Sequence, residues 1–296
     1  ANMTLLLMPR SSATLASQRF ATKVRQVATS SIGAVLTVAC LLGSPMALYF
    51  HAALLEFHQP PANLHMLSHL VTTTLAVLIG TSFVSCFLSS PNPRIPVPEK
   101  QESDGDPSAK SICKHCGTAK APGTRHCKYC QICVVGMDHH CPFINGCVGA
   151  NNHRLFVVFL FYVWLAGLYC VVCSYPPFVG CVFRVPRELW PGPPLLERCA
   201  ALGRMEMLLP LAVVGEMFAT VLLGWQLLVI SSGRRTVDLF DEFFSHLAGA
   251  PSARVRRVAA PSPLSMFGSP GWLFNRWLSP LPHPWHPRWA FLGHRT

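Results

Sequence analysis

Long apolar runs alternate with polar and proline-rich stretches along this chain. Four of these runs contain neither Lys nor Arg, and each has the roughly 20 residues that a helix needs to cross a bilayer. They predict transmembrane helices over residues 31–55, 66–88, 155–179 and 207–230. The predicted fold class is therefore an all-α polytopic membrane protein with four transmembrane helices.

Proline and acidic residues modify three of these spans. The first span contains Gly43-Ser44-Pro45, which predicts a kink, and Pro176-Pro177 predict the end of the third. Glu216 lies inside the fourth span, where an ionisable acid costs about 2.5 to 3.5 kcal/mol at the helix centre. We therefore expect Glu216 to have a polar partner. No internal repeat is evident.

The composition supports a membrane location and argues against a secreted disulfide scaffold. Only 12% of the 296 residues are charged, against about a quarter in an ordinary soluble domain. Seven of the 13 cysteines fall between Cys113 and Cys147, mixed with histidines, which is typical of metal binding in a reducing compartment. The net charge of +11 suits cytosolic loops and anionic ligands. We expect no nucleic-acid partner, because no basic run is interleaved with aromatic residues.

The distribution of Lys and Arg predicts the orientation, because cytosolic loops carry an excess of these residues. Residues 1–30 contain four, 89–154 and 231–296 contain eight each, and 56–65 contain none. The predicted organisation is a cytosolic tail (1–30), two transmembrane helices (31–88), a linker (89–112), a cytosolic cysteine-rich domain (113–154), two further helices joined by a lumenal loop (155–230) and a cytosolic tail (231–296).

Two regions beside the predicted helices allow further expectations. Residues 1–30 contain no acid, which is also typical of a mitochondrial transit peptide, although a basic cytosolic tail explains the same composition. Cys181 and Cys199 both lie in the predicted lumenal loop, where a disulfide between them is possible in an oxidising compartment.

The cysteine-rich segment contains more metal-binding side chains than two zinc sites need. A structural zinc site takes four tetrahedral ligands, and cysteines two residues apart can curl around one ion. With His115 set aside as a surface residue, two sites would use eight of the ten candidates and leave one thiol and one imidazole. Counting alone does not show which pair is left over. The candidates are Cys113, Cys116, His126, Cys127, Cys130, Cys133, His139, His140, Cys141 and Cys147.

A leftover cysteine beside a leftover histidine is what nucleophilic catalysis requires. The thiolate is the nucleophile, and an imidazole can remove the thiol proton. A purely structural zinc module has no need for such a pair. The segment therefore favours an enzyme over a zinc-binding adaptor.

The string Asp138-His139-His140-Cys141, within this segment and between the second and third spans, closely resembles the DHHC family of protein palmitoyltransferases. The resemblance covers residues 113–156 and continues through Pro142, Asn145, Cys147-Val148-Gly149, Asn152 and Phe156. It implies Cys141 as the nucleophile, His139 as the general base and Asp138 as the carboxylate that orients His139. It also implies two structural Zn²⁺ ions, one held by Cys113, Cys116, His126 and Cys133, the other by Cys127, Cys130, His140 and Cys147.

The resemblance further implies that palmitoyl-CoA or another long-chain acyl-CoA donates the acyl group to Cys141, which passes it to cytosolic juxtamembrane cysteines of substrate proteins. The expected location is the Golgi, the endoplasmic reticulum or the plasma membrane, with a cytosolic active site. Lys120, Arg125 and Lys128 are expected at the CoA phosphates. Phe156, Phe159 and Ala166 follow helical spacing along the third span and are expected beside the acyl chain, where Ala166 and Gly167 would leave room.

The chain departs from the family pattern at several positions. Phe143 replaces a tryptophan, Gly146 replaces an asparagine and Gly123 replaces an arginine, while Arg235-Thr236-Val237-Asp238 matches a Thr-Thr-x-Glu element only loosely. An inactive zinc-binding adaptor is thus one alternative. A RING-like ubiquitin ligase is another, but it would need a further Cys-x2-Cys pair after Cys147, and Cys170 and Cys173 lie inside an apolar span.

Overall fold

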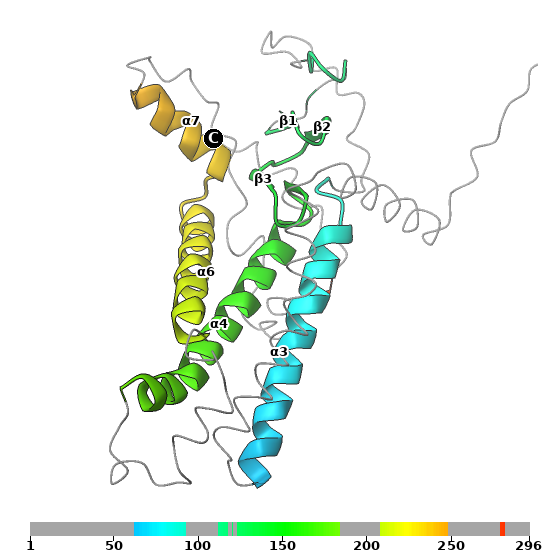
Figure 1. Ribbon diagram of the computed structural model, residues 1–296. Helices are drawn as coiled ribbons and strands as arrows, with labels where there is room; N and C mark the ends of the chain where they lie inside the picture. The colour runs from blue at the N-terminus through cyan, green and yellow to red at the C-terminus, as the bar shows by residue number, and fades with distance from the viewer. Residues whose placement is uncertain are drawn as a thin grey trace, which may run out of the picture.

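The computed structural model describes residues 62–92, 112–117, 120, 123–183, 208–247 and 279–281. Within them, three helices are long and apolar enough to cross a membrane: α3 (Ala62–Leu88), α4 (His153–Val182) and α6 (Leu208–Ser231). A shorter helix, α7 (Thr236–Leu247), follows α6. Four strands lie between α3 and α4: β1 (Arg125–Cys127), β2 (Ile132–Val134), β3 (His139–Cys141) and β4 (Gly146–Val148). The described part of the chain is therefore mostly helical, with short hairpins between its first two helices (Figure 1).

The three helices correspond to the second, third and fourth predicted spans. The predicted amino-terminal tail, 1–30, and the first predicted span, 31–55, lie outside the described residues. The predicted carboxyl-terminal tail, 231–296, is described over residues 231–247 and 279–281. The predicted end of the third span at Pro176-Pro177 is wrong, because α4 continues to Val182. A proline removes one backbone donor and bends a helix without always ending it, and α4 turns sharply near its carboxyl end (Figure 1).

The middle helix, α4, packs against both of its neighbours. It lies between α3 and α6, which do not form a comparable interface with each other (Figure 1). Large apolar side chains cover the outer faces of these helices, as on Leu70, Val172, Leu211 and Val221, each of which is more than half exposed. Apolar surface of this extent needs a hydrocarbon environment or a covering segment.

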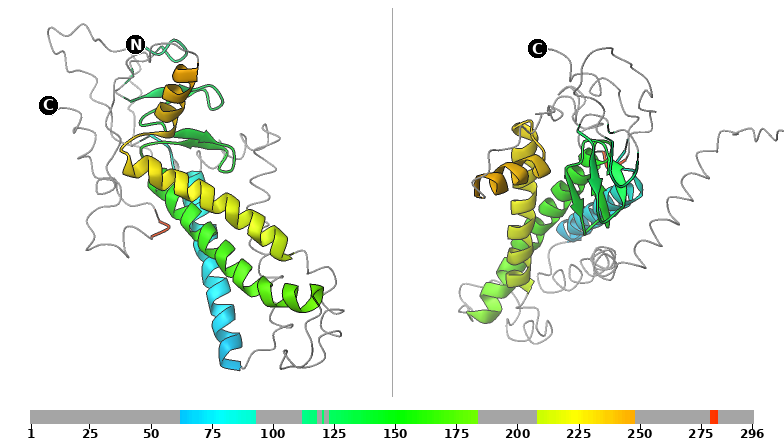
Figure 2. Two further views of the ribbon diagram at one scale, coloured as in Figure 1. Left: turned by 90° about the vertical axis from the view of Figure 1, so that its left-hand side faces the viewer. Right: turned by 90° about the horizontal axis from the view of Figure 1, so that it is seen from above.

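Two antiparallel hairpins sit at the end of the bundle where α3 ends and α4 begins, with α7 beside them (Figure 2). Strands β1 and β2 pair with His126 opposite Cys133, and β3 and β4 pair with His140 opposite Cys147. Directly opposite residues in an antiparallel pair point to the same face of the hairpin. Each hairpin thus presents one histidine and one cysteine side by side.

Asparagine side chains attach the hairpins to the helices. Asn92, just after α3, donates from Nδ2 to the Cys133 carbonyl and accepts from the Val135 amide. The buried Asn152, just before α4, accepts from the Gly149 amide and donates to the Cys147 carbonyl. These bonds satisfy backbone groups that have no partner within the short strands. The hairpins are therefore fixed against the ends of α3 and α4.

The segment contains a repeat of 14 residues, contrary to the expectation that none exists. The spacing Cys-x2-Cys-x9-His-x6-Cys starts at Cys113 and again at Cys127. A third unit starts at Cys141, which again follows a histidine. In each unit, the residue four positions after the first cysteine has a left-handed backbone conformation. The φ angles are 68° at Gly117, 55° at Gln131 and 41° at Asn145.

Candidate functional site

The structure gathers eight of the ten candidate side chains into two groups of four. Their ligand atoms lie within 4.8 Å of one another in each group. The first group contains Cys113, Cys116, His126 and Cys133, and the second contains Cys127, Cys130, His140 and Cys147. These are the two sets that the family resemblance implies, and each uses one unit of the repeat.

The distances within the groups fit a tetrahedral ion. With Zn–S of about 2.3 Å and Zn–N of about 2.0 Å, neighbouring ligand atoms should lie about 3.4 to 3.8 Å apart. In the first group, His126 Nδ1 lies 3.2 Å from Cys116 Sγ and 3.6 Å from Cys113 Sγ. In the second, His140 Nδ1 lies 3.6 Å from Cys127 Sγ and 3.4 Å from Cys130 Sγ. The donor set and its spacing can therefore hold one Zn²⁺ in each group.

The pleat of the hairpins explains why the two groups interleave. Successive side chains of a strand point to opposite faces, so His126 and Cys127 cannot serve the same ion. His126 joins Cys133 in the first group, and Cys127 joins the second. Hydrogen bonds from Cys130 and Cys147 lower the pKa of the Cys127 thiol, which favours the thiolate that a metal requires.

An aromatic ring stacks on the histidine of each group. His115 lies 4.6 Å from His126 between ring centroids, and Tyr129 lies 4.8 Å from His140. Both rings occupy the third position of their repeat unit. His115 is exposed and outside the metal-binding groups, as expected for a surface residue.

The two candidates left over, His139 and Cys141, flank His140 on β3. The alternation of a strand points them to the face opposite His140. Cys141 is 3% exposed and belongs to the apolar core that joins the hairpins to the helices, with Phe83, Phe156 and Leu223. His139 also packs edge-on against Phe156, with ring centroids 5.1 Å apart. The leftover thiol therefore lies where the hairpins meet the membrane-spanning helices.

Asp138 holds His139 from the side away from Cys141. Its buried carboxylate lies 2.8 Å from His139 Nδ1, which directs the other ring nitrogen away from Asp138. Burial alone would lower the pKa of His139, but hydrogen bonds to Asp138 and Cys141 outweigh it and raise the pKa to about 9. Burial opposes ionisation of Asp138, yet the charges of His153 and His139 keep the pKa of this carboxyl below its ordinary value. Asp138 is therefore an anion at neutral pH.

The amino-terminal end of α7 closes over Asp138. Thr236 donates to this carboxylate twice, from its amide at 2.8 Å and from its hydroxyl at 2.9 Å, and the Val237 amide donates to the Asp138 carbonyl at 3.2 Å. The positive end of the helix dipole adds to these bonds. The loosely matched segment 235–238 thus lies directly against the candidate catalytic carboxylate.

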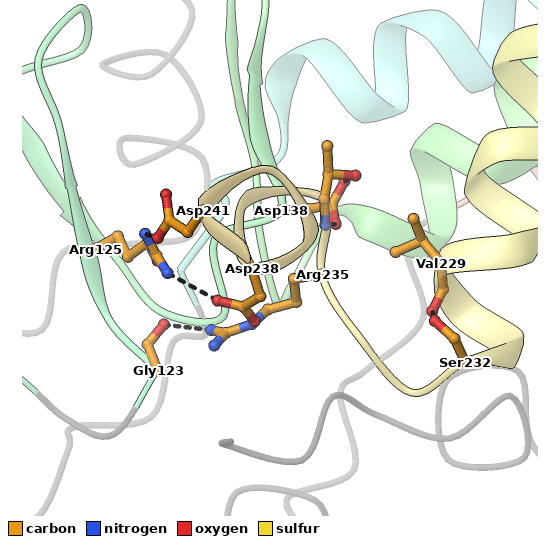
Figure 3. A network of polar contacts seen from close by, with 9 residues as sticks. Gly123, Arg125, Asp138, Val229, Ser232, Arg235, Asp238 and Asp241 are labelled. Carbon is orange, nitrogen blue, oxygen red and sulfur yellow. Dashed lines mark hydrogen bonds and ion pairs between the residues drawn. The ribbon is translucent and has the colours of Figure 1, made fainter. Parts of the chain in front are cut away.

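Ion pairs fix α7 to the first hairpin (Figure 3). Arg125 donates to Asp238 at 2.8 Å and to Asp241 at 2.6 Å, and Arg235 donates to Asp238 at 2.7 Å. Arg235 also donates to the Gly123 carbonyl at 2.7 Å. Two departures from the family pattern, Gly123 and Arg235, are therefore in contact.

The other two departures lie next to Cys141. Phe143 packs against Phe218 of α6 with ring centroids 5.8 Å apart, so an aromatic contact to the helices is retained. Gly146 pairs with Cys141 across β3 and β4, and no side chain therefore stands opposite the thiol. The departures alter the surroundings of Cys141 without touching a metal-binding residue.

The residues expected at the CoA phosphates line one shallow pocket of about 530 Å³ on the outer side of the first metal-binding group. Lys120, Arg125 and Lys128 all contribute to it, with Lys114 and His115. Both terminal nitrogens of Arg125 already contact carboxylates, however. The lysines are therefore the cations best placed to meet an incoming anion.

The residues expected beside the acyl chain occupy one end and the middle of α4. Phe156 and Phe159 are buried in the core next to Cys141, and Ala166 is partly buried further along the helix. Gly167 does not leave an open space, because a Cβ there would overlap the Glu216 carboxylate of α6. The expectation that Gly167 makes room for the chain is therefore wrong.

Glu216 has the polar partner that its position inside a span required. The Thr220 hydroxyl donates to Glu216 Oε1 at 3.3 Å, and Trp164 Nε1 donates to that hydroxyl at 3.1 Å. The Trp164–Thr220 bond links α4 to α6 within the predicted membrane region, and Glu216 joins it through Thr220. The second carboxyl oxygen, Oε2, is buried without a hydrogen-bond partner, so this arrangement satisfies one oxygen of the acid.

Three residues at the site were not singled out from the sequence in this role. Thr236 belongs to the loosely matched segment 235–238. Gln226, which contacts Asp138, and His153, which contacts Gln226, belong to no motif in the sequence. A signal existed for Gln226, because an amide near the end of an apolar span needs a hydrogen-bonding partner just as an acid does. His153 directly follows the helix-capping Asn152, and no sequence signal distinguishes it from a packing histidine.

Comparison with known families supports the resemblance noted from the sequence. Residues 106–240 match the family model described as DHHC palmitoyltransferase. The matched region contains both metal-binding groups, residues 138–141, α4, α6 and the start of α7. The chain matched none of the curated proteins with which it was compared. This match confirms the family resemblance over residues 106–240.

Proposed function

We propose that the chain is a protein S-acyltransferase that carries a long-chain acyl group on Cys141 and transfers it to cysteines of other proteins. One observation carries the proposal: Cys141 lies outside both metal-binding groups and shares a strand face with a histidine held by a buried carboxylate. A thiol and a held imidazole are the components of nucleophilic attack on a thioester. The DHHC palmitoyltransferase domain supports the same class of reaction.

The proposed reaction has two matched halves. His139 holds the proton that Cys141 gives up, in keeping with its raised pKa, and the sulfur attacks the acyl carbonyl of acyl-CoA. A bond from this carbonyl to Cys141 forms, the bond to the CoA sulfur breaks, and His139 returns the proton to the leaving thiolate. A substrate thiol then attacks the new thioester, loses its proton to His139 and releases Cys141. Each half exchanges one thioester for another, so no further energy source is needed.

Asp138 keeps His139 ready for both halves. Its bond to Nδ1 fixes the orientation of the ring, and its charge stabilises the imidazolium that His139 forms when it holds a proton. The two Zn²⁺ ions of this proposal would be structural, because four protein ligands close each site. Their contribution when bound is to hold the short hairpins that present Asp138, His139 and Cys141.

Lys120 and Lys128 are proposed to bind the phosphates of CoA. Each metal site with three thiolates and one histidine carries about one negative charge, which must be offset for a polyanion to approach. The pocket beside the first group supplies the required cations. Arg125 also lines this pocket, but its guanidinium pairs with Asp238 and Asp241 of α7, so we assign phosphate binding to the two lysines.

Reversing both charges, in Lys120→Glu with Lys128→Glu, is expected to raise the KM for palmitoyl-CoA about 10-fold with little change in kcat. Long-range attraction contributes mainly to binding and weakens with salt, so the effect should shrink at high ionic strength. Steady-state kinetics measure both constants. A palmitoyl thioester of a short thiol without phosphates serves as the control donor, and an equal rise in its KM would contradict the assignment.

Phe156, Phe159 and Ala166 are proposed to line the acyl chain along α4. Under this proposal, Ala166→Phe should shift the preferred donor from palmitoyl-CoA toward shorter chains, because the added ring would fill part of the path. The measurement is competition between acyl-CoA donors of different length. Ala212→Phe, on α6 away from the hairpins, is a control of equal volume change. An unchanged chain-length profile in Ala166→Phe would contradict the proposal.

The orientation and domain limits predicted from the sequence are part of this proposal. The hairpins would face the cytosol and the carboxyl end of α4 the lumen, within a membrane of the Golgi, the endoplasmic reticulum or the cell surface. Cys181, at that end of α4, is disulfide-bonded, which suits an oxidising compartment, and its predicted partner Cys199 lies outside the described residues. The proposed substrates are proteins with cysteines at the cytosolic membrane face.

The decisive experiment is incubation of the purified full chain in detergent or vesicles with labelled palmitoyl-CoA. The expected result is one acyl group per chain, released by neutral hydroxylamine and mapped to Cys141 by peptide mass spectrometry. A substrate peptide with a lipid-anchored cysteine should then remove the label. Stable label at another residue, or none, would overturn the proposal, and discharge of ubiquitin from a conjugating enzyme would favour the ligase alternative.

A further inference from the structure

A buried amide connects the candidate catalytic carboxylate to a second histidine. Gln226 of α6 is 3% exposed, and both ends of its side chain have polar partners. Its Nε2 lies 3.2 Å from Asp138 Oδ2, and its Oε1 lies 2.7 Å from His153 Nε2. An amide without partners would cost about 1 to 3 kcal/mol at a buried position. These two contacts therefore offset the cost of burying the Gln226 amide in an apolar helix.

The direction of both hydrogen bonds between His153, Gln226 and Asp138 follows from the charge of the Asp138 carboxylate. An ionised carboxylate only accepts hydrogen bonds, so the NH₂ end of Gln226 must face it. The Gln226 oxygen then faces His153, whose Nε2 must carry a proton and donate. The relay runs from His153 through Gln226 to Asp138, and His139 donates to the same carboxylate from the other side. No other assignment of the amide satisfies both ends.

Gln226 approaches Asp138 from a direction that its other donors do not cover. Thr236 and His139 reach the carboxylate from α7 and from β3, whereas Gln226 reaches it from the membrane-spanning helix α6. Asp138 itself is fully buried, so water does not replace a missing donor. Three separate elements thus fix the plane of the carboxylate that aligns His139.

We infer that Gln226 and His153 are positioning residues for the acyl-transfer reaction, acting through Asp138 to align His139. The inference rests on the proposed function and extends it. Neither residue touches the reacting sulfur, so their loss should lower the rate of the chemical step and leave the affinity for acyl-CoA unchanged. The inference also links α4 and α6 directly to the catalytic strand.

The test measures autoacylation of the full chain at several palmitoyl-CoA concentrations. Gln226→Met keeps the length of the side chain and removes both polar ends, and it should lower the maximal rate about 10-fold at unchanged KM. His153→Gln places an NH₂ near the position of the histidine Nε2 and should retain most of the rate. His153→Leu removes the donor, and its maximal rate should fall to that of Gln226→Met.

Zinc content and thermal unfolding of each variant separate positioning from folding. The inference predicts two zinc ions per chain in all of them. It also predicts that the combined Gln226→Met and His153→Leu variant is no slower than either alone, because the two residues act in one relay. Loss of rate in proportion to lost zinc, a rise in KM, or equal rates for His153→Gln and His153→Leu would each overturn the inference.

The same data separate this inference from the proposed function. If the wild-type chain forms a hydroxylamine-sensitive thioester on Cys141 and Gln226→Met does so at the same rate, the positioning role fails and the transferase stands. If the wild type forms no thioester, the proposed function fails and this inference fails with it.

Discussion

Replacing Cys141 by serine is expected to abolish hydroxylamine-sensitive acylation, with a loss of at least about 100-fold in labelling rate. A hydroxyl ionises far less readily than a thiol, and the ester it would form resists neutral hydroxylamine. Because Cys141 lies outside both metal-binding groups, the variant should still bind two zinc ions. The measurements are labelling with palmitoyl-CoA and metal analysis of the same preparation.

Cys147→Ser is the matched control for this experiment. Cys147 is six residues from Cys141 in the same hairpin and is equally buried, but it belongs to the second metal-binding group. Structural zinc sites contribute roughly 10 kcal/mol or more to folding, so this variant should lose zinc and unfold at a lower temperature. Loss of zinc in Cys141→Ser, with Cys147→Ser keeping two ions, would reverse the assignment of the two cysteines.

Asp138→Asn is expected to lower the autoacylation rate by about three orders of magnitude, as loss of the carboxylate does in other triads. An amide can accept from His139 only by turning its NH₂ toward Thr236 or Gln226, which are donors to the same group. The imidazole would lose its charge partner, and at least one buried donor would be left without an acceptor. The readout is the single-turnover labelling rate.

Glu242→Gln provides the control for a carboxylate that does no chemistry. Glu242 pairs with Arg234 at 2.6 Å, and both side chains are about two-fifths exposed. Such exposed pairs contribute about 0 to 1 kcal/mol to stability, so the rate should not change. A rate for Asp138→Asn close to that of Glu242→Gln would show that His139 does not depend on Asp138.

Local patterns in the sequence were sufficient to predict the three long apolar helices that the structure describes. Apolar runs without Lys or Arg mark α3, α4 and α6, since a bilayer imposes both length and composition. The predicted limits differ from the observed ones by up to four residues, most at the start of α3. The third span was predicted to end too early, because Pro176-Pro177 bend α4 and do not end it. The remaining predicted span, 31–55, lies outside the described residues and stays a prediction.

The grouping of metal-binding residues could have been predicted without a family pattern. The 14-residue repeat assigns Cys113, Cys116, His126 and Cys133 to one ion and the equivalent residues to the other. It also leaves His139 and Cys141 unassigned, which counting alone could not do. The alternation of strands gives the same answer, because His140 must point away from its two neighbours on β3.

The contacts that hold Asp138 could not be predicted in this way. Thr236 and Gln226 are 98 and 88 residues from Asp138 in the chain, and they meet it only because α6 and α7 pack beside the hairpins. Arg235 and Gly123 likewise meet through a hydrogen bond that spans 112 residues of the chain. Such pairs depend on tertiary packing, and a single sequence contains no period or spacing that reveals them.

The incomplete third unit of the repeat explains why Cys141 belongs to neither metal-binding group. Cys141 holds the place that Cys113 and Cys127 hold as first cysteines of their units, but Ile144 stands where the partner cysteine would be, and α4 begins before a second hairpin strand could return. The third unit therefore keeps the left-handed turn of the other two units and lacks the other three side chains that would bind an ion with its first cysteine. One thiol without metal-binding neighbours is thus the direct result of an interrupted third copy.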